Sequence, residues 1–174
     1  MQALSRVSTL QPAIALLEKT PAMLELLLRD VPEDILDWKP AANRWSITGV
    51  LAHLLMIEQL YGDRAKRMVV DDHPLLARFV PPDEAEICER SARRHLEDFV
   101  AARRAHIFFW HSIPASGGSR TAEHPEMGQV TLHQMLNELA NHDLGHLRQI
   151  AELYRASAFY PHAGPFQRYS SPKP

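Results

Sequence analysis

Two histidines, His142 and His146, lie four residues apart in a segment whose apolar residues recur with helical spacing. Residues four apart are neighbours on a helix surface, so the two imidazoles can reach a common point. Both stand on the apolar stripe where a core residue is expected, and His53 does the same in an earlier helical segment. Three imidazoles that face one core can hold a divalent metal ion and leave coordination positions open for a reactant.

The spacing alone does not establish a metal site. Ten histidines occur among the 174 residues, so a pair at this separation can arise by chance. The alternative is a set of core histidines bonded to the backbone or to neighbours such as Tyr61 and Glu138. The zinc-protease helix motif fits less well, because Asp143 stands where a glutamate is needed and only Glu152 follows as a further ligand.

Helical periodicity runs through nearly the whole chain, and no segment alternates convincingly as a strand. Four main helices are expected, over residues 8–30, 47–69, 83–112 and 132–156. This pattern predicts an all-α protein, a four-helix bundle with long connections. In such a bundle, ligands on facing helices meet in the core, which is where His53 and the later pair would be brought together.

Capping residues mark the ends of these helices. Ser46 is the expected N-cap of the second helix, and Thr131 with Gln134 forms a capping box for the fourth. The first helix is expected to break at Thr20-Pro21, where threonine can cap and proline suits the first turn. The third helix is expected to begin behind Pro82 with acidic residues in its first turn.

The connections are expected to be irregular. Residues 114–128 should form a loop, and the aromatic stretch 159–169 should be non-helical and pack back on the bundle. The length fits a single domain over residues 1–174. The formal net charge of -2 argues against a nucleic-acid partner, and no apolar run is long enough to cross a membrane. With one cysteine, Cys88, and no secretion signal, we expect a cytoplasmic protein.

Three blocks of sequence resemble the DinB/YfiT-like superfamily. Trp38-Lys-Pro40, Arg44-Trp-Ser46 and Leu51-Ala-His-Leu54 with Glu58 are similar to its first signature. The segments 124–132 and 141–150 are similar to its second, and the ending 160–169 also matches. The blocks occur in the family's order and span most of the chain, so they are more specific than the histidine spacing.

The resemblance implies a four-helix bundle, usually a homodimer, with a metal triad that maps onto His53, His142 and His146. The ion in this family is a divalent metal, most often zinc or nickel. Members with known activity include S-transferases and isomerases that use a low-molecular-weight thiol. The implied function is therefore a metal-dependent thiol S-transferase acting on a small electrophile as its small-molecule substrate.

Two other functions remain open: a non-catalytic metal- or ligand-binding stress protein and, less favoured, a metal-dependent hydrolase. Glu138, one turn before His142, is a weak candidate for a catalytic base, an imidazole partner or a fourth ligand, and is more simply a carboxylate at the edge of the stripe paired with an arginine. Glu58 is expected to form a structural salt bridge. The arginines of the third helix, interleaved with acidic residues, are expected to form a solvated face.

Overall fold

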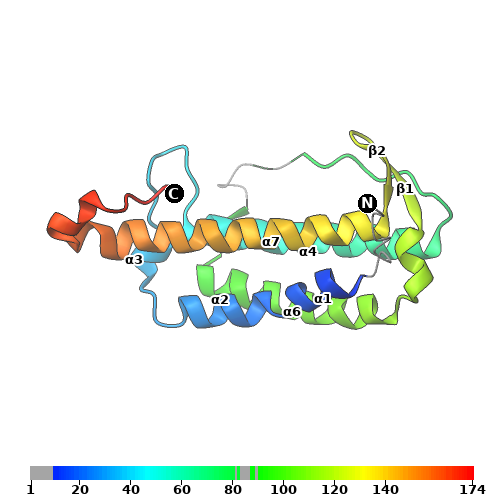
Figure 1. Ribbon diagram of the computed structural model, residues 1–174, viewed down its shortest axis with the longest axis horizontal. Coiled ribbons are helices and arrows are strands. Elements are labelled where there is room, and N and C mark those ends of the chain that lie inside the picture. Colours follow the sequence, from blue (N-terminus) through cyan, green and yellow to red (C-terminus); the bar gives the residue numbers. More distant parts are fainter. Residues whose placement is uncertain (1–9, 81, 83–86, 89) are drawn as a thin grey trace, which may run out of the picture.

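The computed structural model describes residues 10–80, 82, 87–88 and 90–174, and these form a bundle of long helices (Figure 1). The helices are α1 Gln11–Leu17, α2 Thr20–Leu28, α3 Glu33–Leu36, α4 Ile47–Val70, α6 Ala92–Ser112 and α7 Leu132–Tyr154. α1 and α2 are two pieces of the first helix of the bundle and run along α6, whereas α4 contacts both α6 and α7. The expected four-helix bundle is confirmed.

The first helix breaks where the sequence predicted. α1 ends at Leu17 and α2 begins at Thr20, with Pro21 in its first turn. Thr20 does not cap α2, however, because its hydroxyl donates back to the carbonyl of Leu16 at 3.4 Å. Residues 8 and 9 of the predicted helix lie outside the described residues.

The two helices that carry the histidines begin at the predicted caps. The Ser46 hydroxyl accepts a hydrogen bond from the Gly49 N–H at 3.1 Å. The Thr131 hydroxyl accepts from the Gln134 N–H at 3.2 Å, and the Gln134 side chain accepts from the Thr131 N–H at 2.8 Å. Each bond satisfies a backbone donor that the first turn of a helix leaves unpaired, so α4 and α7 start at defined residues.

The third helix begins later than predicted. α6 starts at Ala92, with the Ser91 hydroxyl accepting a hydrogen bond from the Arg94 N–H at 3.3 Å. The predicted start at residue 83 is therefore wrong for the helix that packs in the bundle. The acidic first turn expected there falls on residues 83–86, which lie outside the described residues.

A short β-hairpin replaces part of the loop expected over residues 114–128. Strands β1 Thr121–His124 and β2 Gly128–Thr131 pair antiparallel, with Thr121 opposite Thr131 and His124 opposite Gly128. Gly128 has φ +69°, a conformation that glycine adopts without steric cost. The strands were missed because they are only four residues long and mostly polar. The hairpin leads directly into α7.

The chain after α7 is more helical than predicted. A π-helical turn, Arg155–Phe159, is followed by two 3₁₀ turns, Tyr160–His162 and Gly164–Arg168. The last residues return to the bundle: the Lys173 N–H donates to the Glu152 carboxylate at 3.1 Å, and Arg44 donates to the Pro174 carbonyl. The prediction that residues 159–169 themselves pack back on the bundle is not confirmed, because Phe166 and Tyr169 in that stretch are 71% and 70% exposed and only the residues after it return.

A layer of polar side chains separates two apolar clusters in the core. One cluster joins α1 to the C-terminal part of α4 and the N-terminal part of α7, and the other joins α2 and α3 to the opposite parts of α4 and α7. Between them along the helices lie Glu58, Arg103 and Asp143. Among the described helices, none is long and apolar enough to cross a lipid bilayer.

Candidate metal centre

The three predicted histidines meet between α4 and α7. His142 Nε2 lies 3.0 Å from His53 Nε2 and 3.1 Å from His146 Nε2. All three side chains are half-buried. The i, i+4 spacing brings the His142 and His146 rings to 4.3 Å between centroids, and α4 supplies the third ring from a distant part of the chain. The Nε2 atoms therefore converge on one point.

Hydrogen bonding alone cannot satisfy this arrangement. A ring nitrogen carries either one proton or one lone pair in the ring plane, so His142 Nε2 can make one of its two close contacts favourable and not both. A zinc–nitrogen bond is about 2.0–2.1 Å, and ligand atoms around one ion are then separated by roughly 3 Å. The observed separations match this value, and an ion would engage all three lone pairs. The three histidines could hold a divalent metal ion of the kind that prefers imidazole.

The surroundings favour neutral imidazoles, the form that binds a metal. Burial lowers the pKa of His53 to about 4, with further contributions from His146 and His142. Burial also lowers the pKa of His142 to about 4, assisted by His146 and by the positive charge of Arg103. The pKa of His146 is lowered as well, chiefly by burial. At neutral pH each ring is therefore neutral and has one nitrogen with a free lone pair, which is the form that binds a metal.

Two neighbours orient the rings, and sequence reasoning did not identify either. Gln149 Oε1 lies 2.8 Å from His146 Nδ1, so an Nδ1–H donor leaves the Nε2 lone pair directed at the centre. Gln149 follows His146 by three residues, a helical spacing that could have identified it. The Trp45 ring meets His53 edge-on at 5.0 Å. Among the described residues, the Nδ1 atoms of His53 and His142 have no hydrogen-bond partner.

The centre opens to solvent on the outer side of α7. A groove of about 920 Å³ runs over His142 and His146. Its cationic lining includes Arg44, Arg148 and Lys173. A smaller hollow of about 370 Å³ exposes His53 and His146 beside Trp45. A small molecule can therefore approach the three rings without rearrangement of the helices.

Glu138 lies at the edge of this groove and touches no imidazole. Its carboxylate is 3.4 Å from Asn141 Nδ2, and the described residues offer it no arginine ion pair. The expected pairing with an arginine is therefore not found. Glu138 also borders a second groove of about 640 Å³ between α4, α7 and the hairpin, lined in part by Tyr61 and His124. The two grooves share this carboxylate.

The core-histidine alternative expected hydrogen bonds to the backbone or to neighbours such as Tyr61 and Glu138, and of the bonds that the triad forms only the one to Gln149 is of this kind. The contacts of the triad go to each other and to Gln149. The protease alternative fails on Asp143, because its carboxylate is only 1% exposed and bonded to Arg103. Asp143 is therefore not free to act as a base.

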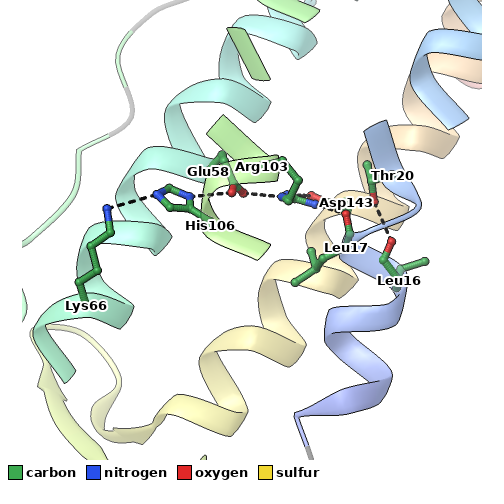
Figure 2. A network of polar contacts seen from close by, with 8 residues as sticks. All are labelled: Leu16, Leu17, Thr20, Glu58, Lys66, Arg103, His106 and Asp143. Atoms are coloured by element: carbon green, nitrogen blue, oxygen red, sulfur yellow. Dashed lines mark hydrogen bonds and ion pairs between the residues drawn. The ribbon is translucent and has the colours of Figure 1, made fainter. Parts of the chain in front are cut away.

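Behind the histidines lies a buried cluster of charges (Figure 2). Arg103 Nε donates to Glu58 at 2.8 Å, and its terminal nitrogens donate to both oxygens of Asp143 at 2.7 and 3.2 Å. The structural salt bridge expected of Glu58 is thus present. The expected solvated face is wrong for Arg103, which is 1% exposed. Its position four residues after Phe99 and three after Val100 places it on the buried stripe of α6, a signal masked by the neighbouring charges.

Comparison with known proteins agrees with this architecture. A family model described as the DinB superfamily matches residues 16–150. The solved structure of YfiT from Bacillus subtilis, described as a probable metal-dependent hydrolase with an unusual four-helix bundle topology, superimposes with a TM-score of 0.74. The two sequences are 20% identical, and the match covers 89% of this chain and 90% of that chain. No curated protein has a matching sequence.

Proposed function

The chain belongs to the DinB superfamily, and from this premise we propose that it is a divalent-metal protein whose ion is held by His53, His142 and His146. The observation that carries the proposal is the convergence of the three Nε2 atoms at 3.0 and 3.1 Å. Zinc and nickel are the ions that best suit three neutral imidazoles with open coordination positions.

The reaction we propose is transfer of a low-molecular-weight thiol to a small electrophile. An ion held by three neutral ligands keeps its full charge and lowers the pKa of a thiol bound to it, which supplies the nucleophile. Gln149 holds the His146 ring in the orientation that directs Nε2 inward. We propose Glu138, on the rim of the groove, as the group that accepts the proton that the thiol loses.

The charge of the groove supports a thiol that carries carboxylates. Arg44, Arg148 and Lys173 line it, and Arg148 is exposed without a hydrogen-bond partner among the described residues. Cationic groups on a groove attract an anionic reactant and orient it by hydrogen bonds. Of the two arginines proposed to bind this anion, Arg148 lies in α7 and Arg44 lies just before α4, so neither belongs to α6.

A metal-dependent hydrolase is the second candidate, favoured by the description given to YfiT. The same three ligands would serve it, with water in place of the thiol as the nucleophile. A non-catalytic metal- or ligand-binding protein is the third, and it requires no proton acceptor at the groove. All three candidate functions use the same bound ion, and they differ in which reaction, if any, the protein catalyses.

The test begins with the metal content of untagged protein. We expect about one divalent ion per chain in the wild type, none in His53→Ala, and an unchanged content in His133→Ala, a control on α7 outside the triad. Conjugation of a fluorogenic electrophile such as monochlorobimane is then followed with a panel of small thiols. Metal without conjugation but with ester hydrolysis would favour the second candidate, and metal with neither activity the third. Protein that takes up no zinc or nickel would overturn the proposal.

We also propose that the protein is a cytoplasmic homodimer. The Phe108 side chain is 80% exposed on α6, whereas Trp110 two residues later is buried. A large aromatic residue on the outside of a helix suits an interface between two copies. Light scattering on the wild type and on Phe108→Glu would measure the association.

A further inference from the structure

We propose that Arg103 is a positioning residue for the metal centre: it fixes the rotation and separation of the two helices that carry the ligands. The inference rests on the proposed metal function. Arg103 belongs to α6, which supplies no ligand, and its guanidinium lies in the polar layer between the two apolar clusters. It contacts neither the ion nor a reactant, and it acts through the helices on either side.

The guanidinium binds both ligand-bearing helices at once. Nε donates to the Glu58 carboxylate of α4 at 2.8 Å, and Nη1 and Nη2 donate to the two Asp143 oxygens of α7 at 2.7 and 3.2 Å. Nη1 also donates to the Leu17 carbonyl at the end of α1, at 3.0 Å. Figure 2 shows this set of contacts from α4 through α6 to α7 and α1.

The partners of Arg103 are close to the ligands in sequence and point elsewhere. Asp143 directly follows His142, which turns its side chain about 100° around α7. Glu58 follows His53 by five residues, so the two side chains leave α4 roughly 140° apart. A rotation of either helix that moved a histidine away from the centre would also pull a carboxylate away from the guanidinium.

The apolar contacts of the bundle do not define this geometry as tightly. Apolar burial is non-directional, whereas the planar fork of an arginine bonds carboxylates only within a narrow range of angles. Apart from the histidines themselves, no hydrogen bond or ion pair joins α4 to α7 within the described part of the chain. A metal site tolerates errors of only about 0.2 Å in its ligand distances. Arg103 therefore supplies a second polar link between α4 and α7 beside the contact of His53 with His142.

His106, supported by Lys66, prevents the Glu58 carboxylate from turning. His106 Nδ1 lies 2.8 Å from the second Glu58 oxygen, and Lys66 Nζ lies 3.4 Å from His106 Nε2. A neutral His106 satisfies both contacts, donating to Glu58 and accepting from Lys66. Both oxygens of Glu58 are thus occupied, and the carboxylate presents a fixed acceptor to Arg103.

The experiment separates geometry from stability by removing all three charges together. In Glu58→Met/Arg103→Met/Asp143→Val the three charges are replaced together by apolar residues, and such replacements often leave stability unchanged or improved. We expect this variant to fold, with helical circular dichroism and cooperative melting, but to bind zinc or nickel about 10- to 100-fold more weakly by competition with a chelator. Wild-type affinity in the folded triple variant would overturn the inference.

The matched control is Arg93→Met on the same helix. Arg93 donates to the carbonyls of Leu28, Arg29 and Val31 at the end of α2 and contacts neither ligand helix. Its loss should lower the melting temperature and leave the metal affinity unchanged, measured where both proteins are fully folded. An equal loss of affinity in this control would mean that stability, and not positioning, determines metal binding.

Arg103→Lys covers the case in which the triple variant does not fold. Lysine retains the charge but lacks the fork, so it cannot bridge both carboxylates in the same way. We expect a folded protein with weakened metal affinity, and a full affinity in this variant would overturn the inference. A wild type that binds no ion would instead overturn the proposed function itself.

Discussion

Two polar clusters lie within a few residues of each other in this bundle. They differ in whether their polar groups have partners and in whether they are buried. In the cluster of Glu58, Arg103 and Asp143, each charged group has partners of the opposite sign, and none is more than 1% exposed. In the cluster of three histidines, nitrogens face nitrogens at 3.0 and 3.1 Å, and the rings remain half-exposed to a groove.

The difference teaches how to tell a structural polar cluster from one built for a ligand. A structural cluster is complete without any added group, because buried donors and acceptors satisfy one another. A ligand cluster gathers donors of one kind, so it is complete only when something else binds. By this criterion the charge cluster is complete within the protein, whereas the histidines form a group that a metal ion could complete.

The largest expected effect is a loss of stability when Arg103 alone is removed from the cluster of Glu58, Arg103 and Asp143. Arg103→Met leaves two buried carboxylates without a counter-ion, which should lower the free energy of unfolding by about 3–5 kcal/mol. His142→Ala removes a ring that has no satisfying partner, so the metal-free protein should change by no more than about 1 kcal/mol. Urea denaturation of the two variants without metal measures both values. Equal losses in the two variants would contradict the distinction between the clusters.

A smaller effect is expected from the bond that orients one histidine. Gln149→Leu removes the acceptor for His146 Nδ1, and we expect metal affinity to fall about tenfold with little change in stability. Asn137→Leu is the matched control, because Asn137 lies 3.2 Å from the ring of His133, a histidine of α7 outside the triad. Chelator competition measures the affinities, and equal values for Gln149→Leu and the wild type would show that the bond does not matter.

A separate effect is a pH dependence of the metal-free protein. The pKa of His53 and of His142 is lowered from 6.5 to about 4, so between these values the unfolded chain binds more protons than the folded one. The free energy of unfolding should therefore rise with pH from about 4 to about 6.5 and then level off. Urea titrations across this range should give a steeper rise for the wild type than for His53→Ala/His142→Ala. The same rise in both proteins would mean that the histidines keep ordinary pKa values.

The fold was predictable where a local signal decides it. The caps Ser46 and Thr131 place the first residue of α4 and of α7, because each satisfies a backbone donor next to it in sequence. The hairpin was not predictable, since its short strands depend on partners such as Leu75, which lies far away in sequence and bridges to Glu123.

The candidate site was predictable in its ligands and not in its support. His53, His142 and His146 stood out because a polar ring on an apolar stripe is conspicuous. Arg103 did not, because Arg94 of the same helix pairs with Glu97 and Asp98 at the surface, and composition cannot show which arginine faces inward. The apolar stripe of α6 indicated that Arg103 faces the core. Because buried charges are uncommon, the sequence nevertheless favoured a solvent-exposed arginine.

The distribution of the ligands along the chain has a consequence for biosynthesis. His53 and His142 are 89 residues apart, and the last ligand lies in the final helix of the bundle. A nascent chain that ends before His142 presents one imidazole of the three, which cannot retain an ion against the competing ligands of a cell. Chains are made from the N-terminus at about 5–20 residues per second, so the donor set is assembled only once α7 has been synthesised. An ion bound by the triad would therefore be acquired only after α7 has been made, and a product interrupted before His142 would lack the site.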